Sequence, residues 1–214
     1  TNMDFMRVKS DKLQVVMFTS ANPGAGKTFV SSNLAMSIAQ TNKKVVLVDV
    51  DIRKGTLSGI FSNSSNRMGL THYLSGSTDK VDDIVGTSEE YEKLDVIFSG
   101  PVPPNPAELL LSERFDRLIT ELRKRYDYII VDNVPAGIVA DASIVNRVVD
   151  LTIFVVRSGV MDRRQLPELE NMYRQEQLHN LSVILNGVPL EHRGYGYGYG
   201  YGYGYGYGYG REEE

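Results

Sequence analysis

A lysine and a threonine close a short glycine-rich segment near the start of the chain, and both have side chains suited to binding phosphate. The segment is Ser20-Ala-Asn-Pro-Gly-Ala-Gly-Lys-Thr28, between an apolar run and a helical pattern. Small residues let backbone N–H groups turn toward phosphate oxygens, and the N-terminus of the following helix adds positive potential. We therefore predict a P-loop, in which Lys27 bridges the β and γ phosphates and the Thr28 hydroxyl binds Mg²⁺.

The predicted loop departs from the usual pattern at one place, because Ala21 stands where the motif's first glycine is expected. The alternative is a glycine-rich turn that binds nothing. The strand–loop–helix setting favours nucleotide binding. The residues expected to contact the nucleotide are Asn22, Pro23, Gly24, Ala25, Gly26, Lys27, Thr28 and Phe29.

Three aspartates lie where apolar runs end. Asp49 and Asp51 are two residues apart, so on a strand their side chains share one face, and Asp132 follows a second run. Ligands bind at the carboxyl ends of strands in open α/β sheets, and Mg²⁺ prefers oxygen ligands. The sequence therefore predicts a catalytic Mg²⁺–ATP site formed by Lys27 with these acids and Thr28. The alternative for each aspartate is that it only caps the next turn.

The elements that position these residues alternate between two patterns. Continuously apolar, β-branched runs predict buried parallel strands, and longer amphipathic stretches predict helices between them. This alternation indicates a doubly wound α/β fold with a mainly parallel sheet. The expected strands are Val15–Thr19, Val45–Val50, Leu94–Phe98, Tyr128–Val131, Leu151–Val156 and Leu181–Leu185, and the expected helices cover about 28–41, 106–125, 141–148 and 165–178.

The helix expected over 106–125 has the clearest start. Asn105 can cap it, Pro106 suits the first helical position, and Glu108 stands where a capping box places its acid. Helical spacing predicts a buried stripe on one face of this helix. The stripe comprises Leu111, Phe115, Leu118, Ile119 and Leu122.

Composition narrows the class of protein. The chain has 214 residues, 42% of them hydrophobic and 23% charged, as in an ordinary globular domain. A net charge of −4 argues against nucleic acid as a partner, because phosphate backbones attract basic surfaces. The absence of cysteine excludes thiolate chemistry and disulfides and fits a reducing compartment.

The sequence changes character at Gly194, where a strict Gly-Tyr alternation begins and runs to Gly210. Glycine loses the most backbone entropy on folding, so we expect a disordered tail over 191–214 after a folded domain over 1–190. The tail is either functional or only a flexible linker or tag. Its tyrosines are Tyr195, Tyr197, Tyr199, Tyr201, Tyr203, Tyr205, Tyr207 and Tyr209.

These motifs together resemble those of bacterial tyrosine kinases (BY-kinases). Ala21–Thr28, Asp49–Arg53 and Ile129–Asp132 resemble their Walker A, A′ and B motifs. A further stretch resembles a segment characteristic of these kinases: Gly100-Pro-Val-Pro-Pro-Asn-Pro-Ala-Glu-Leu-Leu-Leu-Ser-Glu-Arg-Phe115. The resemblance covers about residues 5–190, and the tyrosine cluster is the family's other hallmark.

The resemblance implies a P-loop NTPase of the deviant Walker, partitioning ATPase-like group that binds ATP and Mg²⁺. It implies autophosphorylation of the tyrosine cluster in trans within a ring oligomer, and control of capsule or exopolysaccharide synthesis and export. It also implies a low-molecular-weight tyrosine phosphatase and the polysaccharide export machinery as partners. The domain is expected on the cytoplasmic side of a bacterial inner-membrane protein, and Asn186 is expected near the adenine.

One departure from the family concerns the residues after Asp132, which continue as Asn133-Val134-Pro135 where the family has Thr-Pro-Pro. Two other functions stay open at this point. One is a partitioning or cell-division-type ATPase, which usually has a lysine where this chain has Asn22 and lacks a tyrosine tail. The other is a nucleotide-gated scaffold without kinase activity.

Overall fold

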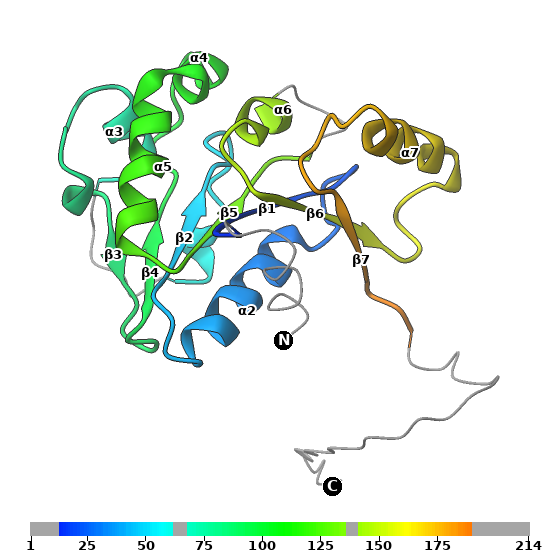
Figure 1. The fold of residues 1–214 in the computed structure, drawn as a ribbon, viewed down its shortest axis with the longest axis horizontal. Helices are drawn as coiled ribbons and strands as arrows, with labels where there is room; N and C mark the ends of the chain where they lie inside the picture. The colour runs from blue at the N-terminus through cyan, green and yellow to red at the C-terminus, as the bar shows by residue number, and fades with distance from the viewer. Residues whose placement is uncertain (1–12, 62–67, 136–140, 190–214) are drawn as a thin grey trace, which may run out of the picture.

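A seven-stranded sheet forms the centre of the molecule in the computed structural model, which describes residues 13–61, 68–135 and 141–189 (Figure 1). The strands lie in the order β3-β4-β2-β5-β1-β6-β7. The neighbouring strands pair in parallel, except for β3, which runs antiparallel to β4. The predicted mainly parallel sheet is confirmed.

The six predicted strands are all present, and no strand end differs from the prediction by more than one residue. The sequence did not predict β3, because two residues are too few for a hydrophobic pattern. The strands are β1 (Val15–Thr19), β2 (Val45–Asp49), β3 (Gly86–Thr87), β4 (Leu94–Ile97), β5 (Tyr128–Asp132), β6 (Leu151–Arg157) and β7 (Ser182–Asn186).

Helices cover both faces of the sheet, as a doubly wound fold requires. In Figure 1, α2 (Lys27–Ala39) lies on one face and α4 to α7 lie on the other. Apolar side chains alternate between the faces: Val16 and Phe18 pack on the α2 side, whereas Val15 and Met17 pack against the opposite core. The remaining helices are α3 (Leu70–Leu74), α4 (Pro106–Leu111), α5 (Glu113–Arg125), α6 (Asp141–Asn146) and α7 (Leu166–Arg174), with single 3-10 turns at Leu57–Gly59, Val81–Asp83 and Arg163–Gln165.

The prediction of one helix over 106–125 is wrong in one respect. Ser112 has an extended backbone, with φ −67° and ψ 150°, and it divides the segment into α4 and α5. The break redirects the first turns, so Leu111 is 57% exposed and Leu110 takes the buried position. Phe115, Leu118, Ile119 and Leu122 are buried as predicted.

The start of α4 also differs in detail from the expected capping box. Pro106 occupies the first turn as predicted. The Asn105 side chain makes no capping bond to the backbone, and its amide instead donates to Glu108 Oε2 at 2.7 Å. The two side chains therefore pair with each other rather than with the helix N-terminus.

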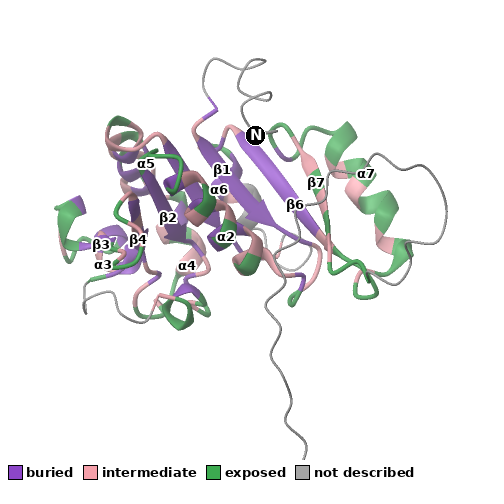
Figure 2. Ribbon diagram, turned by 90° about the horizontal axis from the view of Figure 1, so that it is seen from below, coloured by how far each residue is buried: buried purple, intermediate pink, exposed green. Residues whose placement is uncertain are grey.

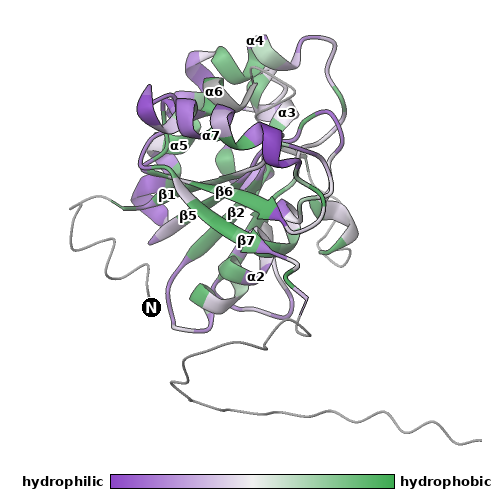
Figure 3. Ribbon diagram, turned by 90° about the vertical axis from the view of Figure 1, so that its right-hand side faces the viewer, coloured by the Kyte–Doolittle hydropathy of each residue, from purple (hydrophilic) through white to green (hydrophobic). Residues whose placement is uncertain are grey.

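The sheet is less well covered at the β7 edge than the apolar runs suggested. Figure 2 shows the central strands buried, whereas β7 alternates between intermediate and exposed residues and α7 has no buried residue. Figure 3 shows that β7 is nevertheless largely hydrophobic. An apolar strand at the edge of a sheet lacks a neighbour on one side, so its pattern alone overstates its burial.

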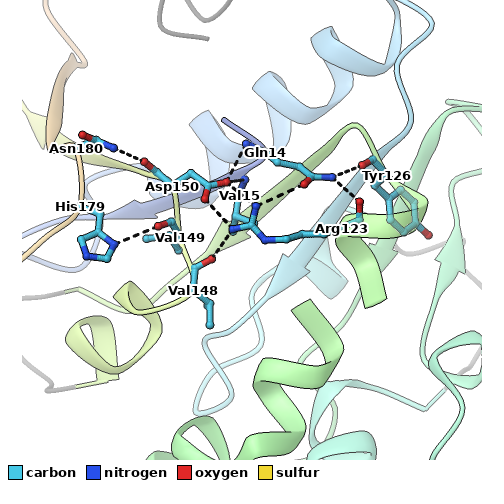
Figure 4. Close-up of polar contacts among 9 residues, drawn as sticks. All are labelled: Gln14, Val15, Arg123, Tyr126, Val148, Val149, Asp150, His179 and Asn180. Atoms are coloured by element: carbon cyan, nitrogen blue, oxygen red, sulfur yellow. Dashed lines mark hydrogen bonds and ion pairs between the residues drawn. The ribbon is translucent and has the colours of Figure 1, made fainter. Parts of the chain in front are cut away.

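A polar network ties three elements together at the amino end of the central strands (Figure 4). Arg123 of α5 donates to both Asp150 oxygens at 2.8 and 2.7 Å. Asp150 Oδ2 also accepts the backbone N–H groups of Gln14 and Val15, just before and at the start of β1. The Gln14 side chain donates to the Arg123 and Tyr126 carbonyls at 2.7 and 2.6 Å. This network fixes α5 against the sheet away from the P-loop.

Among the described residues, no helix combines the length and the apolar character that crossing a bilayer requires.

Candidate functional site

The P-loop connects β1 to α2 at the carboxyl edge of the sheet, as predicted. Gly26 precedes the first turn of α2 with φ 92°, and Gly24 has φ 76°. Both values lie in the left-handed region, which glycine adopts without the steric cost of a Cβ. The loop therefore needs glycine at these two positions to turn its backbone around a phosphate.

The side chains of Thr28 and Asp132 are hydrogen-bonded at the start of α2. The Thr28 hydroxyl donates to Asp132 Oδ2 at 2.6 Å, and it lies 3.1 Å from the Thr56 hydroxyl. Asp132 is 1% exposed, and its Oδ1 is buried without a hydrogen-bond partner. Burial raises the pKa of Asp132 to about 6, although the Thr28 hydrogen bond and the Lys27 charge oppose this rise. The unpaired oxygen is available to a ligand.

Asp49 and Asp51 do not share one face. β2 ends at Asp49, and Asp51 lies outside the strand, directly before a turn at Ile52–Lys54, so the alternation of a strand no longer applies. Asp49 is fully buried, and its two oxygens accept the backbone N–H groups of Asp51 and Leu57, each at 3.1 Å. Asp51 instead lines the cleft beside the P-loop.

The environment of Asp49 also distinguishes it from a surface carboxylate. Burial raises its pKa to about 7, reinforced by the charges of Asp132 and Asp51 and opposed by the two backbone hydrogen bonds. Asp49 and Asp132 are adjacent in the register of β2 and β5. The Asp49 carboxylate therefore bonds to the backbone on both sides of the turn that follows Asp51.

A cleft of about 400 Å³ brings the phosphate-binding and acidic residues together. Lys27 lies in it, and burial lowers the pKa of this lysine while the charges of Asp132 and Asp51 oppose the shift. A larger groove of about 730 Å³ runs along α5, but it contains no part of the P-loop. The residues lining the cleft are Pro23, Gly24, Gly26, Lys27, Thr28, Asp51, Arg53, Lys54, Thr56, Asp132, Asn133, Val134 and Pro135.

The donor set fits a hydrated Mg²⁺ ion better than a metal cage. Among residues 13–61, 68–135 and 141–189, no group of three or more acidic or histidine side chains is placed to hold a metal. At one corner of the cleft, the Thr28 hydroxyl nevertheless binds Asp132 Oδ2, and the other oxygen of this carboxylate, Oδ1, has no hydrogen-bond partner. Mg²⁺ is usually bound by one or two carboxylates plus substrate phosphates and water, which this corner can supply.

Four of the residues predicted to bind nucleotide do not line the cleft. The Asn22 side chain pairs with Gln165, with Nδ2 donating to Oε1 at 2.9 Å. The Phe29 side chain is 65% exposed, whereas Ala25, in the middle of the P-loop, is buried. Asn186 donates to the Ala25 carbonyl at 3.0 Å, so its amide group contacts the P-loop backbone.

The unusual residues after Asp132 have an explanation in the packing. Asn133 is 1% exposed, its amide donates to Met17 Sδ at 3.1 Å, and its Oδ1 accepts the Val134 N–H at 2.8 Å. The Val134 carbonyl accepts from the Thr19 hydroxyl at 2.8 Å. These bonds tie the end of β5 to β1 and keep the Asp132 backbone in place.

Sequence reasoning missed several residues at the site. Arg53, Lys54 and Thr56 line the cleft, and their position just after Asp51 was the available indication. Arg157, at the carboxyl end of β6, donates from Nη1 to the Gly24 carbonyl at 2.9 Å. No sequence motif identifies Gln165 as the partner of Asn22. The predicted phosphorylation sites, from Tyr195 to Tyr209, lie outside the described residues.

Comparison with known proteins gives a consistent result. A family model described as an AAA domain matches residues 13–146. The tyrosine-protein kinase CpsD of Streptococcus pneumoniae serotype 4 is 38% identical over 190 residues, which cover 89% of this chain and 83% of the relative.

Solved structures show the same similarity. The kinase domain of the Escherichia coli tyrosine kinase ETK superposes with a TM-score of 0.80 at 36% identity, over 93% of this chain and 76% of that domain. The septum site-determining protein MinD of Pyrococcus horikoshii, complexed with Mg-ADP, gives a TM-score of 0.65 at 21% identity, over 83% of this chain and 74% of MinD. At that identity the MinD match shows a shared fold alone.

Proposed function

Because this chain belongs to the bacterial tyrosine-protein kinase family, we propose that it transfers the terminal phosphate of ATP to the tyrosines of its own Gly-Tyr tail in a neighbouring copy. Family membership makes the chain a protein-tyrosine kinase with a nucleotide-binding P-loop domain. The observation that supports the proposed site is the convergence of Lys27, Thr28, Asp51 and Asp132 on one cleft.

Different residues of the cleft bind the phosphates and the Mg²⁺ ion. Lys27 and the amides at the start of α2 bind the phosphates, because the helix N-terminus and the ammonium group are both positive. Thr28 and Asp132 would hold Mg²⁺, with the hydroxyl and the unpaired carboxylate oxygen as the available ligands. The bound Mg²⁺–ATP supplies the phosphoryl group and neutralises charge that develops during transfer.

Asp51 is the remaining carboxylate that lines the cleft beside Lys27. A free tyrosine has a pKa of about 10 and a free aspartate of about 3.9, so proton transfer between free groups spans about 6 units, or on the order of 8 kcal/mol. Early deprotonation of the substrate is therefore too costly. In a loose phosphoryl transfer the nucleophile keeps its proton until late. Asp51 then orients the tyrosine hydroxyl and accepts its proton late in the reaction.

The Gly-Tyr tail suits this role as a substrate. Tyrosines two residues apart repeat on one face of an extended chain about every 6.6 Å, at about 3.3 Å per residue. Glycine between them lets the backbone enter a narrow cleft. We place the folded domain within 1–190 and the acceptor tail at 191–214.

The proposed partners are inferred from the family and not from the geometry of the site. We propose that copies assemble in a ring, that a low-molecular-weight tyrosine phosphatase reverses the reaction, and that the cycle controls capsule or exopolysaccharide export. In this proposal the domain acts on the cytoplasmic face of the inner membrane.

One assay tests the proposed reaction. The protein is incubated with Mg²⁺ and ATP, and phosphotyrosine and released phosphate are measured separately. We expect phosphotyrosine in the full chain and a strong loss after deletion of residues 191–214, with ADP binding retained. Phosphate release without phosphotyrosine would indicate an ATPase of the partitioning type. ADP binding without either product would indicate a nucleotide-gated scaffold.

A further inference from the structure

Two side chains at the ends of neighbouring strands bind the P-loop from its outer side. Arg157 Nη1 donates to the Gly24 carbonyl at 2.9 Å, and Asn186 Nδ2 donates to the Ala25 carbonyl at 3.0 Å. Arg157 is the last residue of β6 and Asn186 the last of β7, and the two are paired in the register of these strands. One pair of strand ends therefore holds two consecutive carbonyl groups.

Because of the geometry of the peptide bond, these contacts to the carbonyl groups also determine the direction of the neighbouring amide groups. The described chain contains no cis peptide. In a planar trans peptide, the C=O of one residue and the N–H of the next point in opposite directions. Fixing the Gly24 and Ala25 carbonyls toward the two strands therefore fixes the Ala25 and Gly26 amides toward the opposite side. Within the described part of the chain, the Gly26 amide donates no backbone hydrogen bond, and the Ala25 amide ends the turn at Pro23 and Gly24.

We infer that Arg157 and Asn186 form a clamp that aims the Ala25 and Gly26 amides at the nucleotide phosphates. Arg157 is then a positioning residue, because it acts through the P-loop backbone. This inference rests on the proposed nucleotide site but not on the transfer to tyrosine. It extends the site to strand ends that lie outside the cleft.

Arg157 is exposed and Asn186 is half-buried, and two glycines leave the space that these side chains occupy. A Cβ at Gly26 would lie 2.3 Å from Asn186 Nδ2. Gly187 has φ 67°, and a Cβ there would lie 3.3 Å from Arg157 Cγ. Glycine at both positions lets the two donors approach the loop closely.

The loop needs such external support, because its own backbone is permissive. Gly24 and Gly26 both have positive φ values, and glycine loses more conformational entropy on ordering than any other residue. A loop already held in its binding conformation avoids that loss when the ligand arrives. The clamp therefore contributes to nucleotide affinity, whereas Lys27, Thr28 and Asp51 remain in place for the transfer step.

Calorimetric titration with Mg²⁺–ADP tests the clamp without relying on kinase activity. Arg157→Met keeps the length of the side chain but removes the donor, and Arg157→Lys keeps one donor and the charge. We expect the Kd for ADP to rise about tenfold in Arg157→Met and by a smaller factor in Arg157→Lys. Arg164→Met is the matched control, because Arg164 is exposed and pairs with Asp162 rather than with the P-loop.

Three further measurements separate positioning from other effects. The thermal midpoint of the nucleotide-free protein should be the same in Arg157→Met as in the wild type, and KM for ATP should rise while kcat stays within about twofold. The ratio of the variant and wild-type Kd values should also be the same at low and high salt. Salt screens interactions between charges. If the ratio of Kd values falls toward one as the salt concentration rises, Arg157 acts through its charge, and the clamp is refuted. Unchanged ADP affinity in Arg157→Met refutes it as well.

Discussion

At the scale of single residues, the three aspartates of the site differ in what surrounds them. Asp49 is buried and bonded to backbone N–H groups. Asp132 is buried with one oxygen free, and Asp51 lines the cleft. The same side chain therefore supports a turn at one position, suits a metal at the next, and is open to a substrate at the third.

Asp51→Asn tests the proposed role of Asp51. The substitution keeps the shape of the side chain but removes the charge that accepts the tyrosine proton. We expect autophosphorylation to fall at least a hundredfold, within the range typical of removing a general base, while the Kd for ADP changes less than threefold. Asp79→Asn is the control, because Asp79 pairs with Arg114 outside the cleft. Phosphorylation at the wild-type rate in Asp51→Asn would exclude Asp51 from this role.

The pKa values of Asp49 and Asp132 predict how the stability of the nucleotide-free protein depends on pH. Burial raises them to about 7 and about 6, from an ordinary value of 3.8. Between about pH 4 and 7 the folded protein therefore binds more protons than the unfolded chain. The contribution of these groups to stability is present below pH 4 and is lost as the pH rises through 6 and 7.

Urea unfolding at pH 5 and pH 8, without Mg²⁺ or nucleotide, measures this effect. We expect the free energy of unfolding to fall between the two pH values, and to fall less in Asp49→Asn, which cannot titrate at that position. The same pH dependence in both proteins would contradict the assignment to Asp49.

At the scale of elements, the P-loop shows how one turn depends on two glycines for different reasons. Gly24 and Gly26 both have left-handed backbones. A Cβ at Gly24 would meet no atom within 4 Å, whereas a Cβ at Gly26 would collide with the Asn186 amide. Backbone strain therefore applies at both positions, but a steric clash applies only at Gly26.

This contrast gives a matched pair of substitutions. Gly24→Ala should lower the stability by about 1 kcal/mol, the usual cost of left-handed backbone for alanine. Gly26→Ala should cost at least as much and also displace Asn186 from the loop, so we expect the Kd for ADP to rise at least tenfold more than in Gly24→Ala. ADP titration and thermal unfolding of both variants measure the difference. Equal ADP affinity in the two variants would show that the Asn186 contact does not matter.

At the scale of the whole molecule, one end of the sheet carries the proposed binding site, and the opposite end contributes to stability. The carboxyl ends of β1, β2, β5, β6 and β7 carry or contact the P-loop and the acids. The amino ends of β1 and β6 are joined to α5 through the network of Asp150 and Arg123. Binding and stability should therefore be separable by mutation.

Asp150→Ala tests this separation. The side chains of Arg123 and Asp150 are 29% and 18% exposed, so the pair is only partly screened by solvent. Removing Asp150 also leaves two backbone N–H groups without their acceptor, and we expect a loss of about 2 kcal/mol. This corresponds to a decrease of about 4–8 °C in the thermal midpoint, with ADP affinity unchanged. Asp79→Ala, whose side chain is 85% exposed, should shift the midpoint by less than about 3 °C.

The sheet and the position of the phosphate site could both be predicted from the sequence. Continuously apolar runs of β-branched residues are compatible with little else than buried strands, and Gly-Lys-Thr between such a run and a helix identifies the P-loop. These features depend on neighbours in sequence, so they can be recognised without the fold. The two-residue β3, the break at Ser112 and the exposed side of β7 could not be recognised in this way.

The roles of individual polar groups, in contrast, depend on contacts that form only in the folded protein. Asp49 and Asp51 are two residues apart, yet the end of β2 between them sends one into the core and the other into the cleft. Arg157 and Asn186 are 133 and 161 residues from the carbonyl groups that they bind. Such contacts depend on which strands become neighbours in the sheet, and no local pattern of residues records that order.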